Sequence, residues 1–122
     1  MLKILKRARE ILGDTENWIK GCYGLTSDGE ELTCWQLMVG EEAKCLSVLG
    51  ALHYDSESEY CAVREAEKSL ENEILSSTPF LSIEAWNDHP KTTHDEILTI
   101  LDRIIEKETQ HEIQARNGAH YS

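Results

Sequence analysis

Hydrophobic residues recur every three to four positions in several stretches of this chain, as they do on one face of an α-helix. The clearest stripes predict helices over residues 2–12, 56–75 and 93–105. The last stretch opens with Thr93 followed by Glu96, the pattern of a capping box, in which each side chain bonds the other residue's free amide. Amphipathic helices must bury their apolar faces against one another, so the pattern favours a helical bundle.

Within the stretch 56–75, the spacing divides the side chains between an apolar face and a charged face. Tyr60, Val63, Leu70 and Ile74 are predicted to face the core, and Glu73 is predicted to face water. This division assumes that each charged side chain on a helix finds solvent.

A further helix is predicted to begin at Glu41 and Glu42, whose carboxylates suit the positive end of a helix dipole. Gly50 falls inside it, and a mid-helix glycine costs roughly 1 kcal/mol relative to alanine. The close approach of another backbone is the most natural reason to keep a glycine there. The predicted apolar stripe of this helix consists of Cys45, Val48, Leu49 and Leu52.

Residues 22–36 follow a different pattern, with apolar positions on both sides of Asp28-Gly29. Asp-Gly is a frequent turn of β-hairpins, so this stretch is a candidate hairpin that includes Trp35; the alternative is an ordered loop. The fold class is therefore predicted to be mainly α. We expect a compact single-domain bundle of about four to five helices over residues 1–116, with one short hairpin and a frayed tail over 117–122.

The chain has 122 residues and a formal net charge of −11, which is unevenly distributed. Residues 1–20 carry five basic and three acidic side chains, whereas residues 21–74 carry three basic and twelve acidic ones. Such a surface repels phosphate backbones, so direct nucleic acid binding is not expected. The acidic surface either keeps the protein soluble or engages a protein partner of basic character.

No apolar run is long enough for a membrane span, and the N-terminus lacks the continuous apolar core of a secretion signal, so we expect no membrane association and a cytoplasmic location. The four cysteines are far apart and lack the close spacing of zinc ligands, so they are expected to be free thiols. Asp88, His89, His94 and Asp95 are candidate ligands of a metal ion, but these residues lack a His-x-x-x-His pair. Neither a metal nor another cofactor is predicted.

The stretch from Trp86 to Glu96 concentrates turn formers, a helix start and reactive side chains. One hypothesis is a thiol hydrolase or transferase in which Cys45 is the nucleophile, His94 its base, and Asn87 or Asp88 the group that orients the imidazole. The alternative is that Cys45 is an inert core residue, and that Asn87 and Asp88 serve the turn before Pro90. Trp86 and Thr93 are candidate binding residues next to this group.

Several motifs together resemble a small family of unknown function found in bacteria and their phages. They are the cysteine-led segment Cys45-Leu46-Ser47-Val48-Leu49-Gly50-Ala51-Leu52 and the pair Trp86-Asn87-Asp88 and Thr93-His94-Asp95-Glu96. The similarity spans about residues 7–106. Family members often have tryptophan where this chain has Lys44, which changes the entrance to any pocket at Cys45. The resemblance implies a small α-dominant domain in a bacterial or phage setting, and it implies that Cys45, Asn87, Asp88, Thr93 and His94 approach one another, as a site or as a structural knot.

We therefore expect a non-enzymatic, acidic interaction module, of which a phage-encoded modulator of a host protein is one form. The alternative function is the cysteine-dependent enzyme described above. The small residues around Gly50 would pack equally well within one chain or between two, so self-association stays open.

Overall fold

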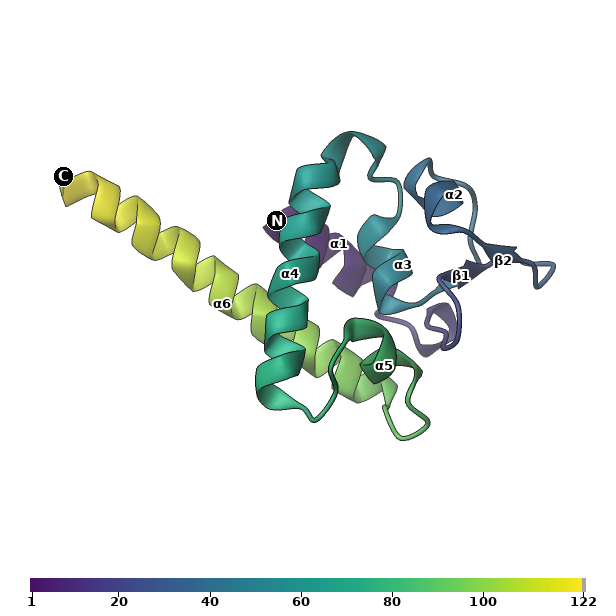
Figure 1. Cartoon of the computed structure of the whole chain (residues 1–122). Coiled ribbons are helices and arrows are strands. Elements are labelled where there is room, and N and C mark those ends of the chain that lie inside the picture. Colours follow the sequence, from purple (N-terminus) through teal and green to yellow (C-terminus); the bar gives the residue numbers. More distant parts are fainter. Residues whose placement is uncertain (122) are drawn as a thin grey trace.

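The predicted helical pattern is present in the computed structural model, which describes the backbone of residues 1–121 and the side chains of residues 1–117. Within these residues the fold is mainly α, as predicted, with six helices where four to five were expected (Figure 1). The helices are α1 (Leu2–Ile11), α2 (Cys34–Met38), α3 (Val48–His53), α4 (Tyr60–Ser77), α5 (Ile83–Asp88) and α6 (His94–Tyr121), with short 3-10 turns at Thr15–Asn17 and Glu57–Glu59.

Helix α3 lies at the centre of the core. It contacts α1, α2, α4 and α5, and every residue from Val48 to Leu52 is buried. Gly50 faces the backbone of the segment before strand β1, where a Cβ atom would lie 2.0 Å from the carbonyl oxygen of Tyr23. The interpretation of Gly50 as a site of close backbone approach is confirmed.

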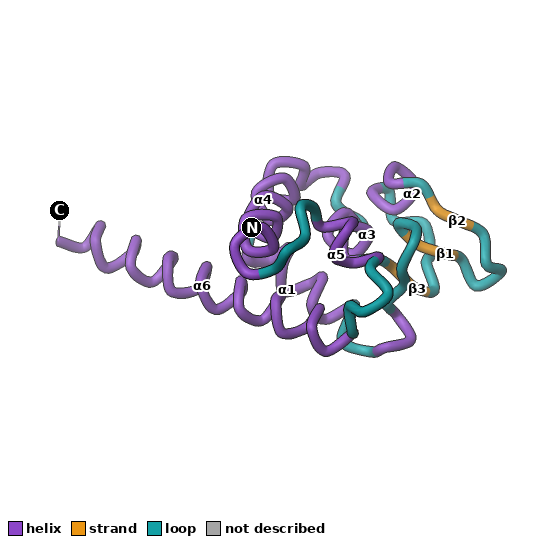
Figure 2. Tube along the Cα trace, turned by 60° about the horizontal axis from the view of Figure 1, so that its bottom comes forward, coloured by secondary structure: helices purple, strands orange, loops and turns teal. Residues whose placement is uncertain are grey.

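The predicted hairpin forms, but it is shorter than residues 22–36. Strand β1 (Gly24–Leu25) pairs antiparallel with β2 (Glu31–Leu32) on one side and with β3 (Cys45–Leu46) on the other. Figure 2 shows these strands gathered at one end of the molecule. Trp35 is not in a strand, because Thr33 caps α2 through a capping box with Gln36 and turns the chain into a helix.

The prediction that a helix begins at Glu41 is wrong, because only the second half of the predicted stretch is helical. Cys45 lies in strand β3, and α3 begins only at Val48, after Ser47, whose side chain accepts a hydrogen bond from the amide of Gly50 at 3.1 Å. The amide of Ser47 donates to the carbonyl of Tyr23 at 2.9 Å, a bond to the hairpin that a helical Ser47 could not make. The segment around Cys45 is therefore not a cysteine-led helix.

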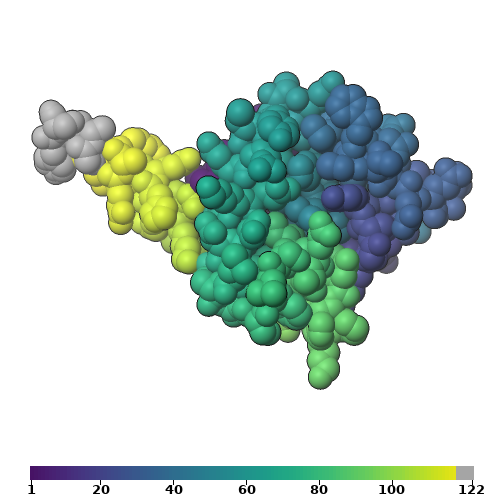
Figure 3. Space-filling model, viewed as in Figure 1, coloured from purple at the N-terminus to yellow at the C-terminus, as the bar shows by residue number. Residues whose placement is uncertain are grey.

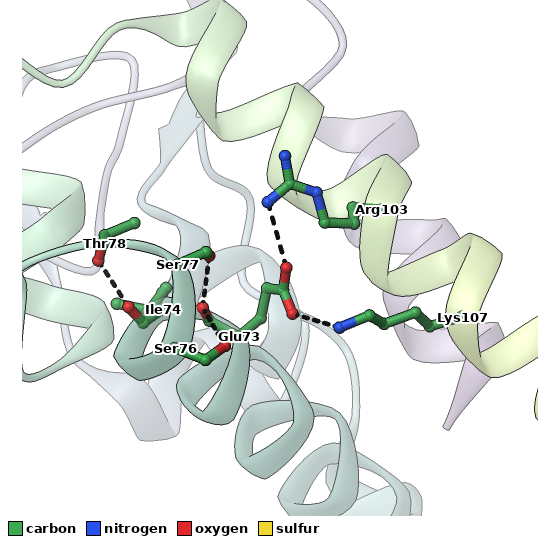
Figure 4. A network of polar contacts seen from close by, with 7 residues as sticks. All are labelled: Glu73, Ile74, Ser76, Ser77, Thr78, Arg103 and Lys107. Atoms are coloured by element: carbon green, nitrogen blue, oxygen red, sulfur yellow. Dashed lines mark hydrogen bonds and ion pairs between the residues drawn. The ribbon is translucent and has the colours of Figure 1, made fainter.

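Two ion pairs that share one buried carboxylate join α4 to α6 (Figure 4). The carboxylate of Glu73 is only 6% exposed and receives Arg103 at 3.2 Å and Lys107 at 2.8 Å. The prediction that Glu73 faces water is wrong, because its charge is neutralised by two cations of α6, which lie 30 and 34 positions further along the chain. The prediction that Tyr60 faces the core is also wrong, since its side chain is exposed.

Helix α6 packs against α1 and α4 with its first turns, and the ribbon of its remaining length projects from the body (Figure 1). The tail predicted over residues 117–122 falls mainly outside the described side chains, and Ser122 lies outside the described backbone. None of the described helices is long and apolar enough to cross a lipid bilayer.

Candidate functional site

Asn87 is the polar centre of the region where α5, α3 and the loop after α1 meet. It sits on α5, which begins because Ser82 accepts a hydrogen bond from the amide of Ala85 at 3.0 Å. Its side chain is 2% exposed. The carboxamide oxygen accepts from the Trp18 indole at 2.8 Å and from the Val48 amide at 3.1 Å. All these contacts hold the fold together, so Asn87 acts as a structural tie.

The amide nitrogen of the Asn87 side chain adds two further hydrogen bonds. The amide nitrogen of Asn87 donates to the carbonyl of Ile19 at 3.1 Å and to Oδ1 of Asp88 at 2.8 Å. That oxygen of Asp88 also accepts the backbone amide of Gly21 at 2.9 Å. Lys20 reinforces the contact by donating to the carbonyls of His89 and Thr92 at 2.6 and 2.8 Å. The segment 18–21 is thereby fastened to α5 and to the loop that follows it.

His94 takes part in this region without reaching Asn87 or Asp88. Its Nε2 lies 2.6 Å from the carbonyl oxygen of Leu12, and its Nδ1 lies 3.3 Å from the hydroxyl of Thr15. A carbonyl can only accept, so Nε2 carries the proton, and in the neutral ring Nδ1 accepts from Thr15. The lone pair that a general base requires is therefore already engaged.

Cys45 does not hydrogen-bond with His94. Cys45 lies in β3 and is buried, with 9% of its surface exposed. It lines a cleft of about 350 Å³ together with Asn17, Lys44 and Tyr54. The hypothesised chain of hydrogen bonds from Cys45 to His94 and on to Asn87 or Asp88 is not among the hydrogen bonds of the described residues. Asn87 and Asp88 bond each other and segment 18–21, whereas the imidazole bonds the end of α1 and the turn after it.

The two candidate binding residues have structural places. Trp86 is buried in the core at 1% exposure. Thr93 is exposed and caps α6, with its hydroxyl accepting the amide of Glu96 at 3.2 Å. Neither side chain lines the cleft beside Cys45 or the larger cleft beside the hairpin.

A larger cleft of about 560 Å³ opens between the hairpin, the start of α3 and helix α5. Figure 3 shows the surfaces of the hairpin (blue) and of α5 (green) on the same face of the molecule. Leu32 and Leu49 give it an apolar floor, and both are buried. The remaining lining residues are Gly21, Cys22, Tyr23, Glu31, Thr33, Cys34, Ser47, Glu84, Asn87 and Asp88.

The cleft is electronegative. Glu31 stands on the hairpin wall, Glu84 and Asp88 stand one turn apart on α5, and none of the lining residues is a lysine, arginine or histidine in the part of the chain that the structure describes. Burial, and after it the Glu31 carboxylate, raises the pKa of the Cys22 thiol. Burial, and after it the Glu84 carboxylate, raises the pKa of the Tyr23 hydroxyl.

The two thiols in the cleft are poor nucleophiles at neutral pH. The pKa of Cys34 is raised, by burial first and by Glu67 next, as the pKa of Cys22 is by its own surroundings. A thiol must lose its proton to attack a substrate, and raised pKa values keep both protonated. Over the described chain, no group of three or more histidine, cysteine or acidic side chains is arranged to hold a metal ion.

The comparison with known proteins gives a family and no chemistry. The profile of a family described as "Family of unknown function (DUF6197)" matches residues 1–107. The chain belongs to this family. No curated protein and no solved structure matches the chain. The DUF6197 match covers the core, the Asn87 tie and the cleft, and it ends at residue 107, whereas α6 continues to Tyr121.

Sequence reasoning missed most of the cleft. The sequence points to Asn87 and Asp88 for a different role, and it singles out neither Glu31 nor Glu84 as a site residue. The excess of acidic residues in 21–74 was the available signal, but it did not show which carboxylates share one hollow with an apolar floor. That depends on how the hairpin docks beside α5.

Proposed function

We propose that this DUF6197 protein is a non-enzymatic interaction module that receives a basic segment of a protein partner in the cleft between the hairpin and α5. The observation that carries the proposal is the combination of three carboxylates, an apolar floor and no lining cation within the described chain. A hollow of this kind suits a side chain that is apolar along its stem and cationic at its tip, as in lysine and arginine.

The overall charge supports the same partner. A net charge of −11 attracts a basic protein over a distance and speeds its association at low salt. The cleft then provides the place where the contact becomes specific, because side chains that enter a hollow lose more water than those on a flat rim.

The proposal extends to setting. Four free cysteines are compatible with a reducing compartment such as the cytoplasm. A phage-encoded modulator that binds a host protein through a basic segment is one form that such a module takes.

A binding titration tests the proposal. A fluorescent glycine–serine peptide that contains both arginine and lysine is titrated with the protein, and binding is followed by fluorescence anisotropy at low and high salt. The double variant Glu31→Gln/Glu84→Gln removes two carboxylates from opposite walls of the cleft. Exposed ion pairs contribute about 0.2–1 kcal/mol each, so we expect a loss of about tenfold in affinity.

The matched control is Glu65→Gln/Glu71→Gln, which makes the same change of charge at two exposed positions of α4 outside the cleft. We expect it to bind nearly as well as the unchanged protein. An equal loss in both double variants would mean that the peptide senses only net charge, and the cleft would then not be the binding site.

A further inference from the structure

We infer that the cleft selects arginine over lysine in its partner. This inference rests on the proposed function and assigns the side chain that the cleft recognises. Three features carry it: the positions of the carboxylates on two walls, the fixed orientation of Asp88, and the aromatic ring of Tyr23 beside an apolar floor.

The carboxylates are placed on facing elements and not in one cluster. Glu31 belongs to β2, and Glu84 and Asp88 belong to α5, four positions apart and so on one side of the helix. A guanidinium has five N–H donors in one plane and can bond carboxylates on more than one side at once. An ammonium is a compact, strongly hydrated charge that loses more water for each carboxylate it meets.

Asp88 is held in a single orientation before any ligand arrives. Oδ1 accepts from the Asn87 carboxamide at 2.8 Å and from the Gly21 amide at 2.9 Å, and Asn87 is itself fixed by its other bonds. Both bonds fall on one oxygen, and no described residue hydrogen-bonds with Oδ2, which is therefore open to a ligand. An acceptor fixed in this way favours a donor of fixed geometry, because neither partner has much conformational freedom left to lose.

Tyr23 provides the third feature. The residue lines the cleft and is 36% exposed, and the nearby Glu84 carboxylate, which lines the same cleft, helps to raise the pKa of the Tyr23 hydroxyl after burial. A guanidinium stacks on an aromatic ring and tolerates apolar surroundings better than an ammonium. Leu32 and Leu49 line the same cleft and offer an apolar surface on which the plane of an arginine head can lie.

Two peptides that differ only in their basic residue test the inference. One glycine–serine peptide contains arginine and its counterpart contains lysine at the same positions, so that net charge is equal. We expect the arginine peptide to bind about fivefold to tenfold more tightly, and we expect this ratio to fall toward one in Tyr23→Ala but to persist in Tyr23→Phe. Circular dichroism before the titration shows whether each variant is folded.

The outcomes separate the inference from the proposed function. If both peptides bind equally well and both weaken in Glu31→Gln/Glu84→Gln, the cleft binds basic segments and the selection of arginine is wrong. If neither peptide binds, the proposed function is wrong as well. If the preference for arginine is present but unchanged by the cleft variants, arginine is recognised elsewhere and the inference is overturned.

Discussion

Replacement of Asn87 by alanine tests whether this side chain ties α5 to α3 and to segment 18–21. The change removes the acceptor of the Trp18 indole and the Val48 amide, and it removes the donor to the Ile19 carbonyl. A buried polar group left without its partner costs about 1–3 kcal/mol. Water from the adjacent cleft can reach part of this site, so the low end applies and the three groups together predict a loss of about 3 kcal/mol.

Chemical denaturation followed by tryptophan fluorescence measures this loss as a change in the free energy of unfolding. In a thermal melt, 3 kcal/mol corresponds to a decrease in Tm of roughly 10 °C for a domain of this size. Asn87→Asp keeps an acceptor but loses both donor bonds, and it places a second carboxylate beside Asp88, so we expect it to be destabilised too.

The control is Asn72→Ala, the same chemical change at an exposed position of α4, which is expected to alter the free energy of unfolding by less than about 0.5 kcal/mol. If Asn87→Ala cost no more than Asn72→Ala, the hydrogen bonds of Asn87 would contribute nothing measurable. The region would then be held by packing alone, and Asn87 would not fix the orientation of Asp88.

Three further predictions concern the ion pairs between α4 and α6, the close packing of Gly50, and the thiols. The Lys107 and Arg103 partners hold the pKa of Glu73 below its ordinary value of 4.5. The stability that the Glu73 carboxylate contributes is therefore present above that pH and is lost as pH falls through the folded-state pKa. Glu73→Gln should lower the free energy of unfolding in denaturant by about 1–2 kcal/mol at pH 7, and an equal loss at pH 3 would contradict this. Gly50→Ala should destabilise the fold by about 1–3 kcal/mol or more, despite the better helix propensity of alanine, because its Cβ would lie 2.0 Å from a backbone oxygen. An unchanged Tm would show that this contact relaxes easily. When the native protein is alkylated and analysed by mass spectrometry, exposed Cys61 should react first and buried Cys45 only after unfolding. Fast reaction of Cys45 near pH 6 would contradict this and would support the hypothesis of a cysteine-dependent enzyme.

The long amphipathic helices could be predicted from the sequence because each has one buried face and one wet face. The segment around Cys45 could not, because α3 is buried along its whole apolar run and shows no polar face to mark its period. Its start is set by Ser47, a single capping residue, and by the hairpin, whose strands pair with β3 through backbone atoms. Side-chain patterns carry little information about such pairings.

The surroundings of single side chains were predicted wrongly where their partners lie far away in the sequence. Glu73 follows the pattern of a wet face, but its partners Arg103 and Lys107 lie on another helix, and no local spacing indicates them. For Asn87, the sequence indicated an unusual polar residue and a structural knot as one alternative, which is the role its bonds support. The cleft draws its lining from the hairpin, the start of α3 and α5, so only the folded chain reveals it.

The most direct test of the central claim is an NMR titration of the ¹⁵N-labelled protein with the arginine-containing glycine–serine peptide. If the cleft is the binding site, the amide signals that move should be those of residues 21–23, 31–34 and 84–88, which belong to the segments that surround it. Signals of the acidic outer face of α4, such as those of Glu65 and Glu71, should stay in place. Shifts centred on α4, or spread evenly over the acidic surface, would contradict the claim that this cleft receives the basic partner.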